Sequence, residues 1–172
     1  MRAELRVDVG AIEHNVVRLA AAAPQSAVCA VVKANGYGHG MMISARAALA
    51  GGATWLAVAT SQEGRELRAV HHDVPIIVLG ALTGAELELA LAHRLDVTAW
   101  TPGFAEHVIA AATAQPGAIP ARVHVKLDTG LGRLGTRDAA EADYTAGLIA
   151  AASATTLVAG MTHFATADGM DD

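Results

Sequence analysis

Residues 30–40 read AVVKANGYGHG, a short apolar run that passes through Lys33 into a glycine-rich stretch. Apolar β-branched residues favour a buried strand, and glycines let backbone come close to a ligand. The stretch predicts a strand that ends at Lys33 and a loop that follows it. In surroundings of low dielectric such a lysine favours its neutral, nucleophilic form. The alternative is a lysine that merely reaches solvent beside a flexible turn.

Five further apolar runs follow this one along the chain. The six predicted strands are Val28–Lys33, Thr54–Ala59, Pro75–Leu79, Asp96–Ala99, Arg122–Asp128 and Thr156–Phe164. Their near-continuous apolar character is typical of parallel strands buried on both faces. Helices are expected between them, and one more over Val9–Ala23. Their start signals are the capping boxes Thr60/Glu63 and Thr83/Glu86, and Thr101 followed by Pro102.

Alternation of strands and helices leaves two architectures, a doubly wound open sheet and a (β/α)₈ barrel. A barrel has eight strands and about 250 residues. With 172 residues and six predicted strands, a barrel would be incomplete, with about six of eight βα units present.

Composition excludes several classes of function. The net charge is −5 and basic residues form no run, which argues against nucleic acid or an anionic membrane as partner. No apolar stretch reaches the ~20 residues of a membrane span. Cys29 is the single cysteine, and no spacing of Cys and His predicts a metal site. These features predict a cytoplasmic protein without a metal.

Lysine is scarce, since only Lys33 and Lys126 among the 12 basic residues are lysines. Arginine stays protonated, whereas a desolvated lysine can lose its proton and form a Schiff base or a carbamate. Lysines kept against this bias are therefore candidates for chemistry.

Lys126 opens a second motif, KLDTGLGRLG, over residues 126–135. It contains G-x-G-x-x-G, which favours a nicotinamide-binding oxidoreductase when it follows the first strand. Here it follows the fifth strand, and the acid expected ~20 residues later is missing. Lys126 and Arg133 would repel each other unless an anion joins them. That anion could be Asp128, a bound phosphate or a modified Lys126.

The third motif is THFATAD, residues 162–168. His163 is predicted to end the sixth strand. It would then lie with Lys33 and Lys126 at the carboxyl ends of the strands, which form the catalytic face of a barrel. A lone histidine is more often a packed core group, but three ionisable strand ends at one edge are harder to explain by packing. Asp168 is expected to be a cap or a surface group.

All three motifs resemble those of alanine racemase, in the family's order and over essentially the whole chain. The resemblance implies a partial N-terminal barrel domain over residues 1–172, without the family's C-terminal β-domain. It also implies pyridoxal 5′-phosphate (PLP) as cofactor, alanine as substrate and a homodimer whose partner supplies a catalytic tyrosine. Gly36 and Thr166 are mild departures from the family pattern.

The resemblance assigns roles residue by residue. Lys33 would be the catalytic residue and would form the Schiff base with PLP. The other expected cofactor-binding residues are Tyr37 at the phosphate, Arg133 at the phenolic oxygen, His163 against the ring, and Val31 and Leu79 along the pocket. Lys126 matches a position that is often carbamylated in the family.

Two alternatives remain within PLP chemistry, a non-catalytic single-domain PLP-binding protein and a racemase of broader substrate range. Proton transfer is needed on both faces of the substrate, and only Lys33 is available here. We therefore expect this chain alone to be inactive.

Overall fold

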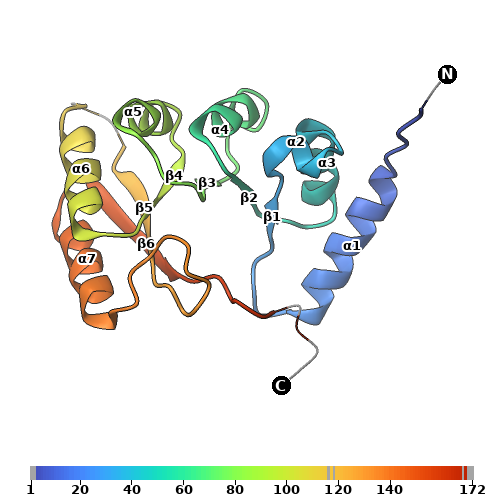
Figure 1. Ribbon diagram of the computed structural model, residues 1–172. Coiled ribbons are helices and arrows are strands. Elements are labelled where there is room, and N and C mark those ends of the chain that lie inside the picture. Colours follow the sequence, from blue (N-terminus) through green and yellow to red (C-terminus); the bar gives the residue numbers. More distant parts are fainter. Residues whose placement is uncertain (1–2, 116, 118, 168, 170–172) are drawn as a thin grey trace. The chain divides into compact units, whose positions relative to one another are not determined.

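The structure is a computed structural model that describes residues 3–115, 117, 119–167 and 169. The chain forms two compact units, residues 1–80 and 81–172. Each unit contains three parallel strands with helices between them (Figure 1). All six strands predicted from the apolar runs are present among the described residues, most of them shorter than predicted.

The first unit begins with a helix and then alternates strands and helices. Its elements are α1 (Val9–Ala22), β1 (Cys29–Val31), α2 (Lys33–Tyr37), α3 (Met41–Ala50), β2 (Trp55–Val58), α4 (Ser61–Arg68) and β3 (Ile76–Val78). Strand β2 pairs with β1 on one side and with β3 on the other. β3 is buried throughout, whereas β1 is partly exposed. The unit's core contains Leu56, Val58, Leu67, Ile76 and Val78.

The second unit has the same alternation. Its elements are α5 (Gly84–Ala92), β4 (Asp96–Ala99), α6 (Pro102–Thr113), β5 (Ala121–Lys126), α7 (Ala139–Ala151) and β6 (Thr155–Met161). Strand β5 pairs with β4 and with β6. Strand β4 is buried throughout, and β6 is largely exposed or half-buried.

The predicted helix starts are confirmed. Thr60 and Glu63 form a full capping box at α4, and Thr83 and Glu86 form another at α5. Each threonine hydroxyl accepts from the glutamate N–H, and each glutamate side chain accepts from the threonine N–H, so two otherwise unpaired donors are satisfied. At α6, Thr101 is the N-cap and proline occupies the first turn.

The pairing of β5 with β6 contains one β-bulge. Val123 pairs with Leu157 but His124 pairs with Ala159, so Val158 is an extra residue in β6. Beyond the bulge Met161 pairs with Lys126.

Candidate functional site

Lys33 lies just after β1, at the carboxyl end of the strand. Strand pairing stops at Val31, and Lys33 opens α2, so the prediction that the strand runs to Lys33 is two residues too long. The side chain of Lys33 is half-buried, and its Nζ lies 6.0 Å from the centre of the Tyr37 ring. The structure therefore brings these two predicted residues together.

The element α2, called the Lys33 turn below, is left-handed. The backbone φ angles of Ala34, Asn35, Gly36 and Tyr37 lie between 51° and 63°. A left-handed conformation costs roughly 1–2 kcal/mol for each residue other than glycine. Three of these four residues carry a Cβ, so hydrogen bonds must hold the turn in place.

Two groups of hydrogen bonds hold the Lys33 turn. From inside, the Asn35 carbonyl accepts from the Gly40 N–H at 2.8 Å, and the Asn35 side chain accepts from the Met41 N–H at 2.9 Å. From outside, the Glu63 carboxylate accepts from the Ala34 N–H at 2.7 Å. Hydrogen bonds from two directions thus hold the strained backbone next to Lys33 in place.

The other predicted residues of the first unit also lie at strand ends. Val31 closes β1, and Leu79 directly follows β3, where its N–H donates to the Val58 carbonyl. Leu79 is half-buried, whereas Val31 and Tyr37 are exposed. In the parallel sheet β1–β2–β3 these ends share one edge.

Lys126 closes β5 and is buried, as the sequence predicts, with 6% of its surface exposed. Its Nζ donates to the backbone carbonyl of Arg133 at 2.8 Å. Burial lowers the pKa of Lys126, and the nearby Arg133 guanidinium lowers it further, whereas Asp128 acts in the opposite direction. The amine therefore lies closer to its neutral form than an ordinary lysine.

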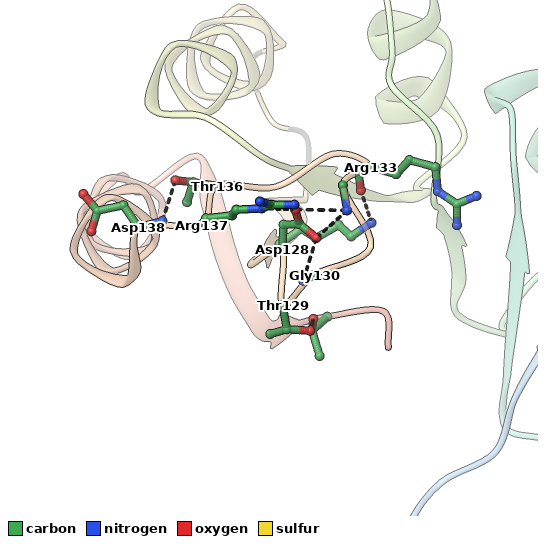
Figure 2. A network of polar contacts seen from close by, with 10 residues as sticks. Asp128, Thr129, Gly130, Arg133, Thr136, Arg137 and Asp138 are labelled. Carbon is green, nitrogen blue, oxygen red and sulfur yellow. Dashed lines mark hydrogen bonds and ion pairs between the residues drawn. The ribbon is translucent and has the colours of Figure 1, made fainter. Parts of the chain in front are cut away.

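The loop Asp128–Arg137, called the Arg133 loop below, is organised by one carboxylate (Figure 2). Asp128 accepts from the N–H groups of Gly130 and Gly132 and from Nε of Arg137 at 3.0 Å. The Arg137 bond is the largest cause, and the Gly132 bond the second, that lower the Asp128 pKa to about 2. Because Asp128 is held in this way, it does not form an ion pair with Lys126.

Arg133 points away from this cluster (Figure 2), and its side chain is exposed. Lys126 and Arg133 are thus brought together through the Arg133 backbone, while its guanidinium is left for another group. Of the three anions considered for this pair, Asp128 is already engaged by Arg137.

His163 lies two residues past the end of β6, so the prediction that it ends the strand is wrong by that margin. Its side chain is exposed. The neighbouring Thr162 hydroxyl lies 2.7 Å from the hydroxyl of Thr129, which joins this segment to the Arg133 loop. Asp168 lies outside the described residues.

Sequence reasoning missed a buried polar group in the second unit. Asp96 at the start of β4 is 1% exposed and accepts from Arg122 at 2.9 Å and from His124 at 3.0 Å. The alternation of β5 places Arg122, His124 and Lys126 on one face, which was the available signal. What it lacked was the pairing of β4 with β5 that brings Asp96 opposite them.

Two classes of site are not seen among the described residues. None of their helices is both long and apolar enough for a membrane span. Nor does the described part of the chain gather three or more His, Cys, Asp or Glu side chains in a way that would hold a metal ion.

Solved structures share this fold. Alanine racemase from E. faecalis matches with a TM-score of 0.89 and 37% identity, over 96% of this chain and 44% of that one. The Streptomyces coelicolor enzyme matches with a TM-score of 0.88 and 39% identity, over 96% and 45%. These matches confirm the predicted fold class, an incomplete (β/α)₈ barrel of six parallel strands alternating with helices.

The family description "Alanine racemase, N-terminal domain" matches residues 7–172. Among curated relatives, alanine racemase from Frankia casuarinae is 46% identical over 81% of this chain and 35% of its own length. That from Thermobifida fusca is 40% identical over 99% and 46%. The chain belongs to the alanine racemase family and spans less than half the length of these relatives.

Proposed function

We propose that this chain is the Lys33-bearing part of a PLP-dependent enzyme that interconverts L- and D-alanine, and thereby supplies D-alanine for cell-wall peptidoglycan. The observation that carries the proposal is Lys33, half-buried at a strand end on a strained turn that two sets of hydrogen bonds hold. Family membership supports the same reaction.

The side chains present fit such a cofactor. Lys33 offers an amine, Tyr37 a phenol and Arg133 a guanidinium, and each is half-buried or exposed. Among the described residues, neither the Tyr37 hydroxyl nor the Arg133 guanidinium is used in a hydrogen bond. In the first unit Lys33 would bind a carbonyl as a Schiff base and Tyr37 a phosphate, and in the second unit Arg133 would bind a phenolic oxygen.

When bound, PLP supplies an electron sink for the negative charge that develops at the substrate Cα. Lys33 Nζ would hold or move the proton on one face of the substrate Cα, so that inversion requires a second group that delivers or removes the proton on the opposite face. A tyrosine from outside this chain serves the other face in a homodimer. The residues that we expect to hold the cofactor are Lys33, Tyr37, Arg133, His163, Val31 and Leu79.

The direct test is to incubate the protein with PLP, reduce it with borohydride and locate the adduct by peptide mass. We expect the label on Lys33, and a Lys33→Ala variant should lose it. Because Lys126 is the other lysine, it is an internal control for nonspecific reaction. Label shared evenly between the two lysines would overturn the assignment.

Racemisation by residues 1–172 with added PLP should be far below that of a full-length relative, since one of the two proton donors is not in this chain. Turnover of D-alanine close to that of such a relative would show that this chain alone contains the whole catalytic machinery.

We also propose that Lys126 is carbamylated. The neutral amine attacks carbon dioxide, a nitrogen–carbon bond forms, and the amine proton is released, which leaves one negative charge beside Arg133. The lowered Lys126 pKa favours the required neutral amine. The new anion would bond the arginine side chain, which Asp128 does not.

The carbamate is tested with ¹³C-bicarbonate and carbon NMR. We expect a carbamate resonance that disappears in Lys126→Ala and persists in Lys33→Ala. In the full-length enzyme, activity lost in Lys126→Ala should partly return with short carboxylates. A resonance that follows Lys33 would contradict the proposal.

A further inference from the structure

Glu63 binds backbone from two different strand ends at once. Its Oε2 accepts from Ala59 N–H at 2.9 Å and from Thr60 N–H at 3.2 Å, both just after β2. Its Oε1 accepts from Ala34 N–H at 2.7 Å, directly after Lys33. One carboxylate therefore joins the start of α4 to the start of the Lys33 turn.

A capping box alone does not account for the bond to Ala34. In the second capping box, both side-chain bonds of Glu86 go to Thr83, one to its N–H and one to its hydroxyl. Glu63 caps α4 with Oε2 and has Oε1 free for a residue 29 positions earlier. The additional contact is thus not required by the helix that contains Glu63.

Ala34 needs this acceptor because the strand ladder ends there. The Val32 N–H donates to the Ala57 carbonyl of β2 at 2.9 Å. In a parallel ladder the next donor would be the Ala34 N–H and the next acceptor the Ala59 carbonyl. The Glu63 carboxylate takes the place of that acceptor, so the chain leaves the sheet at Ala34 and enters the left-handed conformation with its N–H paired.

We propose that Glu63 is a positioning residue for Lys33. By anchoring the Ala34 N–H it fixes where the backbone turns, and so the direction in which the Lys33 side chain leaves the strand end. This role rests on the proposed function, in which Lys33 carries PLP. Glu63 acts through Ala34 and touches no reacting atom.

The test uses Glu63→Gln and Glu63→Asp. Glutamine keeps the size but can present only one acceptor oxygen, so it loses either Ala34 or the β2 end. Aspartate keeps an acid in the first turn of α4, which still favours the helix, but is one methylene shorter. Thr60→Val is the matched control, because it removes the other half of the capping box and leaves the Glu63 carboxylate.

The first readout is hydrogen exchange of the Ala34 amide in protein without PLP. Exchange should accelerate at least about tenfold in Glu63→Asp, whose shorter side chain loses the bond to Ala34, and to a smaller extent in Glu63→Gln, where at best a neutral oxygen replaces the charged acceptor. Thr60→Val should accelerate amides of α4 and leave Ala34 unchanged. Equal acceleration at Ala34 in Thr60→Val would mean that α4 stability alone controls the turn, and would overturn the proposal.

The second readout is the fraction of protein chains that carry borohydride-trapped PLP on Lys33. It should fall several-fold in the Glu63 variants and remain at the wild-type level in Thr60→Val. An unchanged fraction labelled on Lys33 despite faster Ala34 exchange would overturn the positioning role alone. Absence of label on Lys33 in the wild type would overturn the proposed function, and this role with it.

Discussion

The Lys33 turn and the Arg133 loop are both segments of strained backbone held by a carboxylate, but the carboxylate comes from a different place in each. Each follows a parallel strand, contains a residue expected to bind the cofactor, and includes residues with positive φ other than glycine, Ala34 in one and Leu134 in the other. Each is held by a carboxylate that accepts backbone N–H groups. For the turn this is Glu63, 29 residues away; for the loop it is Asp128, the loop's own first residue.

The sequence distance between each segment and its carboxylate determines which substitutions should disturb that segment. The Arg133 loop closes on itself, because Asp128 also donates its N–H to the Thr136 carbonyl at 2.8 Å. The Lys33 turn depends on a neighbouring helix being in place. We expect the loop to be sensitive to changes of its own backbone, and the turn to changes in its surroundings.

The largest effect is expected from Gly135→Ala in the Arg133 loop. Gly135 has φ +105°, and an added Cβ would lie 2.9 Å from both the Asp128 nitrogen and the Lys126 oxygen, which are backbone atoms that cannot rotate away. Strain and overlap together should cost about 3 kcal/mol or more, measured by urea unfolding.

Gly132→Ala is the matched control within the same loop. Gly132 has φ +74°, but the nearest atom to its added Cβ is the end of the Arg137 side chain at 3.7 Å. Its free energy of unfolding should fall only by the cost of placing alanine in the left-handed conformation, about 1–2 kcal/mol. Equal losses in the two variants would show that the close backbone approach at Gly135 is unimportant.

A smaller effect is expected from Gly36→Ala in the Lys33 turn. Its Cβ would lie 2.8 Å from the Ser44 hydroxyl, which is a side chain and can move. We expect the free energy of unfolding of Gly36→Ala to fall by about 1–3 kcal/mol. The Ser44 hydroxyl is buried and makes no hydrogen bond in the described part of the chain. Adding Ser44→Ala should therefore recover part of the loss, and a further decrease in the double variant would contradict this account.

Acid should weaken the Arg133 loop through Asp128. Its pKa falls from an ordinary 3.8 to about 2 on folding. The stabilisation is complete above the unfolded pKa and is lost as pH falls through the folded one. In thermal unfolding, Asp128→Asn should be less stable than wild type above about pH 4, and the two curves should converge towards pH 2. Parallel curves over this range would exclude the role of Asp128.

The smallest change in the free energy of unfolding is expected for Lys126→Met, measured at neutral pH without carbon dioxide. Folding lowers the Lys126 pKa, so the charged amine opposes folding, and wild-type stability should rise with pH towards the ordinary pKa of 10.5. Methionine removes this rise, which alkaline titration of unfolding would detect. A methionine variant that still gains stability over the same alkaline range as wild type would mean that another group is responsible.

Sequence patterns predicted the strands and capping boxes because these depend on neighbours within a few residues. The apolar runs gave β5 and the burial of Lys126, and Thr60 with Glu63 gave the start of α4. The end of β1 was placed too late. Nothing local shows that strand pairing stops at Val31 and not at Lys33, and the left-handed conformation of Ala34 depends on an acceptor that only the folded sheet brings to it.

The same reason explains the site. Asp128 lies two residues from Lys126 in sequence, so pairing of the two was a reasonable interpretation, yet Arg137 and two glycine N–H groups hold the carboxylate. The sequence did not predict the bonds of Asp96, because its partners Arg122 and His124 lie on another strand. Local pattern gives the residue types at a site, and the pairing of distant elements decides which of them bond.

The β-bulge in β6 has a consequence for how the gene can change. Side chains alternate along a strand, so removing one residue moves every later side chain to the opposite face. Because Val158 is the extra residue, deleting its codon would instead restore regular pairing, with Ala159 still opposite His124 and Met161 still opposite Lys126. The Thr98–Met161 contact and the Thr129–Thr162 contact, which both lie beyond the bulge, would keep their partners. The gene should therefore tolerate the loss of three nucleotides at the codon of Val158 better than at a codon within a regularly paired strand such as β4.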